Sequence, residues 1–252
     1  MNKTINLFLR TIFVLDKTSH GGNVGAAARA LKTMQFSNLV LCNSSLKDIH
    51  LNSDAIAMAS NAQDTLANIK VVENLSQALS EATLTFAMTA RKRKDFESVD
   101  IRQMAIIAHK HLLETENHKI AVVMGNEQSG LDNASLYDFN YVVNIPANPE
   151  YSSLNVAQAL QLAAWELRYE YILTGEIKEQ KMEGEDIATH GQMNHLIKSV
   201  ESILSESGYE KEKLASLERK LTHILLRAKI SKEEVQMLLG IVKFLKAQNP
   251  NC

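Results

Sequence analysis

The first candidate site is the segment HGGNVGAAARA at residues 20–30, where glycines, an amide (Asn23) and an arginine follow an apolar run. Gly21 and Gly22 allow the backbone to approach a ligand closely, and a helix that begins here offers free N–H groups to an anion. Arg29 adds a permanently charged planar group that suits phosphate. The segment lacks the G-x-G-x-x-G spacing of dinucleotide sites. Taken alone, it is more simply interpreted as a packed helix with an exposed arginine that is paired to a carboxylate.

The second candidate site is VVMGNEQSGL at residues 122–131, which lies at the end of a predicted strand. Gly125 permits the backbone to turn beneath a ligand, and Gly130 indicates a second turn. Glu127 supplies a carboxylate between them. Any turn from a strand into a helix favours Gly, Asn and Glu, so this segment is a weak signal by itself.

The third candidate site is IPANPEYSSLNVAQ at residues 145–158, where two of the chain's three prolines indicate an irregular loop before a long helix. Ser152 or Ser153 could serve only to cap that helix. Asn155 lies in the first turn of a strongly apolar helix, so we expect its amide to have a structural partner.

A run of four cations, Arg91, Lys92, Arg93 and Lys94, follows the predicted strand at residues 83–88. Consecutive cations repel one another unless they are solvated or meet phosphates. The run is therefore either a solvated loop or an RNA contact, and its place beside the other segments keeps the RNA interpretation open.

Apolar runs alternate with helical patterns over the first 175 residues, which predicts an α/β fold with a mostly parallel sheet covered on both faces. Strands are expected at Asn6–Leu15, Asn38–Cys42, Ile69–Val72, Thr83–Met88, Ile120–Met124 and Tyr141–Ile145. Helices are expected at Val24–Met34, Asp54–Leu66, Leu75–Ser80, Asp100–Leu113 and Leu154–Tyr171, with Trp165 in the core. Ligands of such sheets bind in the loops at the carboxyl ends of the strands.

The remainder of the chain differs in composition. Residues 176–189, EIKEQKMEGEDIAT, are polar and predict a linker. Residues 190–252 carry 10 basic and 7 acidic side chains and have apolar residues at helical spacing, so we expect an extension of roughly three helices. Ser231 and Glu234 have the spacing of a capping box at the start of the last helix. We therefore expect one domain at residues 1–175, a linker and a helical extension.

The overall composition excludes several classes of protein. A net charge of -2 argues against a chain built throughout for nucleic-acid binding, so any RNA contact must come from a local patch. The 2 cysteines and 8 histidines lack the spacing of disulfide frameworks and metal sites, so we expect no metal. Since the sequence shows neither a signal-peptide pattern nor an apolar stretch of membrane-spanning length, we expect a cytoplasmic protein.

Together and in this order, the three segments resemble the three signature motifs of the SpoU class of SPOUT RNA methyltransferases. The residues that carry the resemblance are SHGGNVGAAARALKTM, VVMGNEQSGL and NIPANPEYSSLNVAQALQ. Within the class, the chain is most similar to the tRNA (cytidine/uridine-2′-O-)-methyltransferases, because LERKLTHILLRAKISKEEVQMLLGIV also looks like their C-terminal extension. The resemblance covers essentially the whole chain and implies a Rossmann-like sheet whose C-terminal part forms a trefoil knot.

The resemblance implies 2′-O-methylation of a tRNA ribose with S-adenosyl-L-methionine, at cytidine or uridine in anticodon-loop position 32. It also implies a homodimer in which the catalytic arginine, Arg29, reaches a site formed partly by the other protomer. The other implied catalytic positions are Asn23, Glu127, Ser153 and Asn155. The implied cofactor contacts are Met88, Thr89, Ala90, Gly125, Ile145, Ser152, Ser153 and Leu154. Because a guanidinium is very hard to deprotonate, we expect Arg29 to orient the ribose through its phosphate rather than to act as a base.

Three alternatives remain open at this point. Within the class, the substrate could be ribosomal RNA or another position of tRNA. Outside it, the chain could be an RNA-binding module without catalytic activity. A nucleotide-dependent oxidoreductase is the third alternative, and that class would bind NAD rather than S-adenosylhomocysteine.

Overall fold

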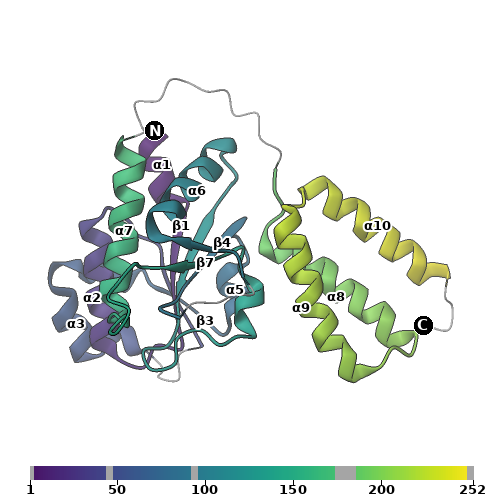
Figure 1. Ribbon diagram of the computed structural model, residues 1–252, viewed down its shortest axis with the longest axis horizontal. Coiled ribbons are helices and arrows are strands. Elements are labelled where there is room, and N and C mark those ends of the chain that lie inside the picture. Colours follow the sequence, from purple (N-terminus) through teal and green to yellow (C-terminus); the bar gives the residue numbers. More distant parts are fainter. Residues whose placement is uncertain (1–2, 44–47, 92–95, 174–185, 249–252) are drawn as a thin grey trace.

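The computed structural model describes residues 3–43, 48–91, 96–173 and 186–248, which form an α/β domain followed by a group of helices (Figure 1). The domain is built on a seven-stranded sheet with the order β3-β2-β1-β6-β4-β7-β5, and all neighbouring strands are parallel. The strands are β1 (Thr11–Asp16), β2 (Leu39–Cys42), β3 (Lys70–Val72), β4 (Leu84–Met88), β5 (Ser98–Asp100), β6 (Ile120–Met124) and β7 (Tyr141–Asn144). The expected α/β fold with a parallel sheet is confirmed.

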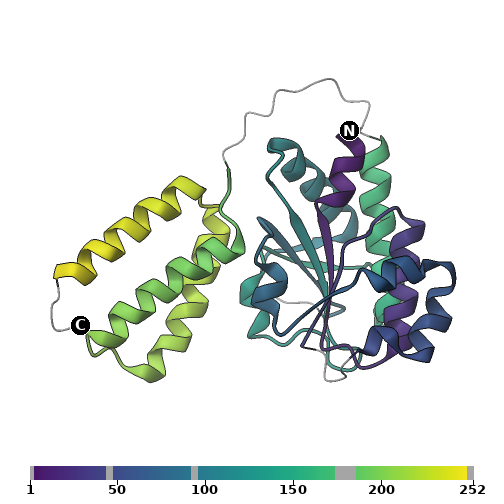
Figure 2. The ribbon, with the colours of Figure 1, turned by 180° about the vertical axis from the view of Figure 1, so that it is seen from behind.

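The central strands are buried on both faces, and successive side chains alternate between two apolar clusters. In β1, for example, Phe13 and Leu15 belong to one cluster and Val14 to the other. The helices that cover the first face are α1 (Lys3–Leu9), α2 (Gly21–Thr33), α3 (Ser53–Ala59), α4 (Gln63–Ala67), α6 (Ile101–Glu114) and α7 (Val156–Leu173). The opposite face is covered by α5 (Leu75–Leu79) and the 3₁₀ helix η3 (Ser135–Asp138), as the two opposite views show (Figures 1 and 2).

The strand expected over Asn6–Leu15 is wrong in its first half, because Lys3–Leu9 form helix α1. Phe8 of this helix is buried, and its ring packs against the rings of Phe36 and Tyr171. A short apolar run is compatible with a strand or a helix, and here the contacts with α7 favour the helix.

The structure differs from the expected elements in three further places. The single helix expected over Asp54–Leu66 is interrupted at Ser60, whose φ of 51° ends α3 before α4 begins. Strand β5 was not expected, because Val99 is its single apolar residue and one residue makes no pattern. Trp165 is not in the core but 50% exposed, since α7 buries its opposite face, including Leu160 and Leu167.

The expected three-helix extension is confirmed: it consists of α8 (His190–Glu206), α9 (Lys211–Ala228) and α10 (Lys232–Gln248), which enclose an apolar cluster of their own. The capping box is confirmed as well, because Ser231 N donates to Glu234 Oε2 at 2.8 Å and Glu234 N donates to Ser231 Oγ at 3.2 Å. Among the described residues, no helix is both long and apolar enough to cross a membrane.

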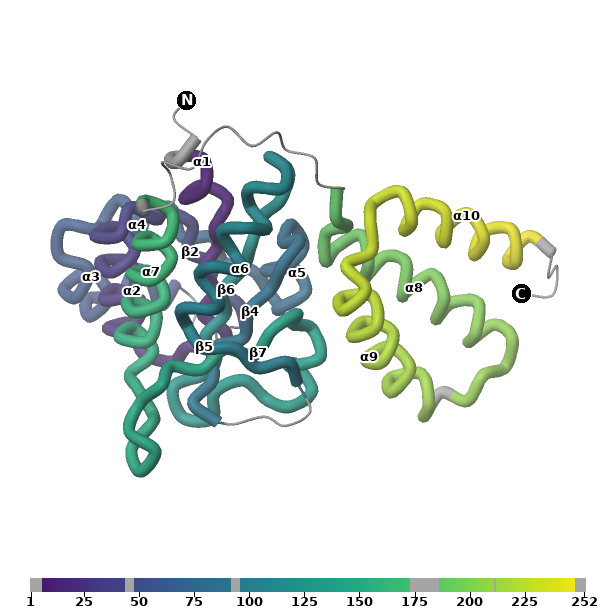
Figure 3. The backbone as a smooth tube through the Cα atoms, turned by 45° about the horizontal axis from the view of Figure 1, so that its top comes forward, coloured from purple at the N-terminus to yellow at the C-terminus, as the bar shows by residue number. Residues whose placement is uncertain are grey.

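Backbone hydrogen bonds of residues 188 and 190 connect the extension to the domain. Of the segment expected as a linker, the structure describes residues 186–189, and Ala188 N donates to the carbonyl of Ile230 at 2.9 Å within the extension. The next residue, His190, donates its backbone N–H to Ala82 of the domain at 2.8 Å. The extension therefore lies against the domain beside α5, while α7 lies on the far side of the sheet (Figures 1 and 3).

Candidate active site

The carboxyl ends of the adjacent strands β6, β4 and β7 surround a cavity of about 360 Å³. The loop that follows each of these strands forms part of its wall, and the first turns of α7 complete it. All eight positions with expected cofactor contacts lie around this cavity: Met88, Thr89, Ala90, Gly125, Ile145, Ser152, Ser153 and Leu154. The fold thus brings together three separate parts of the sequence where parallel α/β sheets bind their ligands.

Gly125 allows the loop after β6 to fold back on itself. A Cβ atom at this position would lie 2.3 Å from the backbone carbonyl carbon of Gly130, so no larger residue fits without a shift of the loop. Gly130 has a φ of 67°, in the left-handed region that glycine adopts at low cost, and its N–H donates to the carbonyl of Asn126 at 2.8 Å. The tight turn places backbone groups of residues 125–130 on the cavity wall.

Glu127 accepts hydrogen bonds from the segment that precedes and begins α2. Its Oε1 accepts from Thr18 Oγ1 at 2.6 Å and from Asn23 Nδ2 at 3.0 Å. Its Oε2 accepts from the backbone N of Ser19 at 3.3 Å and from Ser19 Oγ at 3.2 Å. Sequence reasoning missed Thr18 and Ser19, for which two consecutive hydroxyl residues just before the HGGN segment were the available signal.

Partial burial acts to raise the pKa of Glu127, but hydrogen bonds from Thr18, Asn23 and backbone N–H groups outweigh it and lower the pKa to about 2. Glu127 is therefore ionised over the whole physiological range. A carboxylate with so low a pKa is a weak proton acceptor, and its geometry suits the orientation of its donors rather than general-base catalysis.

The Glu127→Gln variant is expected to be less stable than wild type at neutral pH, by a free-energy difference that decreases in acid. Because the folded-state pKa lies below the ordinary value of 4.5, the ionised group stabilises the fold above about pH 4.5, and this contribution disappears as the pH falls toward about 2. Urea unfolding should show wild type as more stable than the variant at neutral pH, with a difference that shrinks toward about pH 3. A difference independent of pH would contradict this, and Glu150→Gln, an exposed carboxylate of the neighbouring loop, is the control.

Asn155 joins the third motif segment to the first. Its Nδ2 donates to Asn23 Oδ1 at 2.9 Å, and its Oδ1 accepts from the backbone N of Ala157 at 2.9 Å, which caps the start of α7. The expected structural partner of Asn155 is therefore Asn23, which itself donates to Glu127. One continuous line of hydrogen bonds thus connects all three segments beside the cavity.

Arg29 is exposed on α2 and is not among the described residues that line the cavity of its own chain. The small residues of the same helix are packed: a Cβ atom on Gly25 would lie 2.0 Å from the carbonyl oxygen of Ala55 in α3. The packed helix and the exposed arginine are therefore confirmed, whereas no carboxylate among the described residues forms an ion pair with Arg29. The exposed side chain of Arg29 is therefore available to a group outside its own chain.

The basic run is only partly described. Arg91 lines the cavity, and its backbone N donates to Thr89 Oγ1 at 3.1 Å. Lys92, Arg93 and Lys94 lie outside the described residues. At the carboxyl edge of the sheet, at least one cation of the run therefore lies on the cavity wall.

An open groove between α2 and α7 lies next to the cavity. Residues on its walls include Asn23, Ala26 and Ala30 of α2, Leu154 and Asn155 just before α7, and Leu162 of α7. An apolar stripe continues from it along α7, formed by Leu162, Trp165, Tyr169 and Ile172, which are 40–50% exposed. A contiguous exposed apolar stripe of this kind marks an interaction surface.

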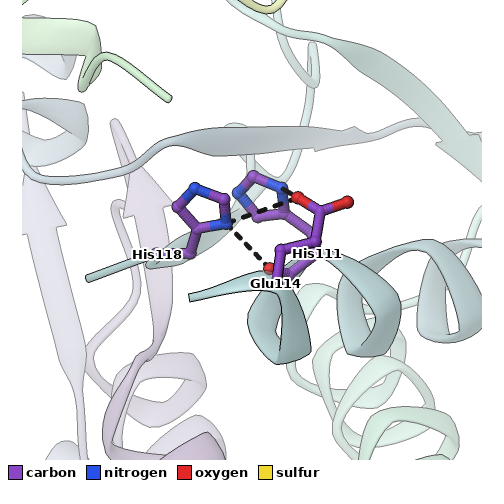
Figure 4. Close-up of side chains that lie close together, drawn as sticks. All are labelled: His111, Glu114 and His118. Carbon is purple, nitrogen blue, oxygen red and sulfur yellow. Dashed lines mark hydrogen bonds and ion pairs between the residues drawn. The ribbon is translucent and has the colours of Figure 1, made fainter. Parts of the chain in front are cut away.

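Within the described part of the chain, one cluster has the composition of a metal site: His111, Glu114 and His118 (Figure 4). The Nδ1 atoms of His111 and His118 lie 3.4 and 3.5 Å from Glu114 Oε2. The two rings are stacked, however, with centroids 3.9 Å apart and an interplanar angle of 8°, so their in-plane lone pairs lie in nearly parallel planes and cannot both point at one ion. His118 also donates from Nδ1 to the carbonyl of His111 at 2.8 Å and accepts the N–H of Ile187 at 3.3 Å. Through His118, the cluster therefore contacts the backbone just before the extension.

A cavity at the carboxyl ends of three adjacent parallel strands, with a glycine turn and fixed polar side chains around it, defines an α/β protein that binds a small ligand at this edge. Comparison with known families identifies the class further. Residues 10–165 match the SpoU rRNA Methylase family. The chain therefore belongs to this family.

Curated and solved relatives agree with this membership. The chain is 36% identical over 239 residues to the tRNA (cytidine/uridine-2′-O-)-methyltransferase TrmJ of Escherichia coli K12. The aligned region covers 94% of this chain and 95% of that protein. The crystal structure of TrmJ from Z. mobilis ZM4 matches with a TM-score of 0.80 and 26% identity, over 94% of this chain and 99% of that one. A probable methyltransferase from Bordetella pertussis is 48% identical with a TM-score of 0.64, over 66% of this chain and 99% of that one.

Proposed function

We propose that the chain is a ribose 2′-O-methyltransferase that acts on tRNA with S-adenosyl-L-methionine, with cytidine or uridine at anticodon-loop position 32 as its target. The observation that carries the proposal is the convergence of the three motif segments on one cavity and one line of hydrogen bonds. Support for tRNA comes from the TrmJ relative, whose similarity includes the extension as well as the sheet domain.

The cavity suits this cofactor in size and chemistry. Its volume of about 360 Å³ lies in the range of small-molecule sites. Apolar side chains such as Met88, Ile145 and Leu154 can cover a purine ring, while the backbone of the loop after β6 and the hydroxyls of Ser152 and Ser153 can bind polar ends. When bound, S-adenosyl-L-methionine supplies an electrophilic methyl group that a ribose hydroxyl can accept.

The side chains around the cavity divide the remaining work. Arg29 binds the phosphate next to the target ribose and so orients its 2′-hydroxyl. Ser153, exposed at the cavity wall, contacts the cofactor or the hydroxyl. Glu127 and Asn23 hold the first and second segments in register, and Asn155 extends that support to the start of α7.

A homodimer would complete the site. Arg29 does not line the cavity of its own chain, whereas the groove and the apolar stripe of α7 leave a surface beside it without a partner among the described residues. A second copy that covers this stripe would bring one protomer's Arg29 toward the other's cavity. Such an enzyme would work in the cytoplasm, where tRNA is modified.

The trefoil knot also stays a prediction. It rests on the membership of the chain in the SpoU family.

Two measurements test the proposed function. Calorimetry should show binding of S-adenosylhomocysteine and no binding of NAD, and the reverse result would favour an oxidoreductase. Mapping of 2′-O-methyl groups in RNA from a deletion strain should show a loss at position 32 of tRNA. A loss in ribosomal RNA or at another tRNA position would reassign the substrate, and unchanged RNA together with intact RNA binding would favour a module without catalytic activity.

A further inference from the structure

The extension contacts the sheet domain through a trio of rings. The imidazole of His223 on α9 lies 6.3 Å from the ring of Phe96 and 5.8 Å from the ring of Tyr137, measured between centroids. The rings of Phe96 and Tyr137 lie 5.1 Å apart. The three rings meet edge to face, at interplanar angles of 66–87°, which is a favourable arrangement for aromatic groups.

The two partners of His223 lie a few residues beyond two of the segments that line the cavity. Phe96 lies in the connection from β4 to β5, whose first residues, 89–91, line the cavity. Tyr137 lies in η3, which follows the cavity loop of residues 125–130. The ring of His223 therefore packs against residues that follow both of these cavity segments in the chain.

A hydrogen bond strengthens the same contact. Asn140 Nδ2 donates to the carbonyl of Leu226 on α9 at 3.1 Å. Its Oδ1 accepts from the backbone N and the Oγ1 of Thr85 in β4, at 2.9 and 3.0 Å. Asn140 thus joins α9 directly to the strand that carries the first cavity loop, one helical turn from His223.

We propose that His223 is a positioning residue for cofactor binding: the extension, through this ring, holds residues 89–91 and 125–130 in the shape that the cofactor requires. The inference rests on the proposed function, because it concerns the same cavity. It assigns to the extension a part in cofactor binding that is separate from any contact with tRNA. Ring packing accounts for the role, so a phenyl ring should substitute for the imidazole.

The test compares affinities for S-adenosylhomocysteine in the full chain by calorimetry. His223→Ala is expected to raise the dissociation constant by about three- to tenfold, the range that loss of one aromatic contact allows. His223→Phe should remain within about twofold of wild type. Phe96→Leu, which removes the ring from the loop side, should raise the constant as His223→Ala does and provides a second variant if the first does not fold.

Two controls separate positioning from general loss of stability. His195→Ala removes an exposed histidine of α8 and should change nothing. Val235→Ala weakens the buried core of the extension without touching either loop, so it should lower the melting temperature while the dissociation constant stays near wild type. An unchanged constant in His223→Ala, or an equal rise in Val235→Ala, would overturn the inference. If wild type itself fails to bind S-adenosylhomocysteine, the proposed function fails instead.

Discussion

Replacing Arg29 with alanine is expected to lower kcat for methyl transfer by about 100-fold or more, because the ribose and its phosphate lose the group that orients them. The dissociation constant for S-adenosylhomocysteine is expected to stay within about twofold of wild type, since Arg29 does not line the cofactor cavity of its own chain. The side chain is exposed, so the melting temperature should change little. Single-turnover assays with tRNA, paired with calorimetry, measure both effects.

Lys32→Ala is the matched control, because Lys32 is another exposed cation of α2 and its ion pair with Asp64 at 2.7 Å is a surface contact. Unchanged turnover in Arg29→Ala would remove Arg29 from the mechanism. Mixing Arg29→Ala subunits with Gly125→Ala subunits tests the dimer. If the arginine acts across the interface, the mixed dimer regains one complete site and measurable activity, whereas an arginine that acts within its own chain gives no recovery.

Gly125→Ala is expected to raise the dissociation constant for S-adenosylhomocysteine by about tenfold or more, since the cavity wall has to move. The added Cβ would lie 2.3 Å from the carbonyl carbon of Gly130 and 2.4 Å from the N of Leu131. Both neighbours are backbone atoms, which cannot rotate away as a side chain can. The turn after β6 must therefore open, and its N–H and carbonyl groups leave the positions that face the ligand.

Calorimetry on folded protein checks this expectation, with Gly240→Ala as the control. A Cβ on Gly240, in helix α10, meets no atom within 4 Å, so that variant should bind the cofactor normally and gain up to about 1 kcal/mol of stability from the better helix former. Wild-type affinity in Gly125→Ala would show that the loop tolerates the shift and would contradict the assigned role.

The motif segments could be predicted from the sequence because their signals are local. Gly125 directly follows a recognisable strand and marks a turn. Asn155 lies between another strand and a helix, and its polar side chain is suited to the start of that helix. Because the sheet is parallel, both segments lie at its carboxyl edge. The partners of Glu127 could not be predicted in the same way. Thr18 and Ser19 are more than a hundred residues away in the chain, and only the packing of β1 beside β6 brings their hydroxyl groups within reach.

The errors in the fold have a related cause. Apolar residues indicate burial, but they do not show which surface buries them. Residues 3–9 form a helix because α7 and the aromatic rings near it provide a surface for one. Trp165 is half exposed because α7 has two apolar faces and the sheet covers one of them. Whether the second face is covered depends on what binds to it, and the sequence pattern of this chain does not show that.

The line of hydrogen bonds from Glu127 through Asn23 to Asn155 has a consequence for the evolution of the protein. Asn23 uses its Nδ2 toward the carboxylate and its Oδ1 toward the other amide, so each of its two contacts needs a particular end of the group. A substitution at any one of the three positions would leave a donor or an acceptor unmatched at another. Among descendants of this chain, the three positions are therefore expected to be inherited as a unit, and lineages that lose one should show relaxed selection on the other two.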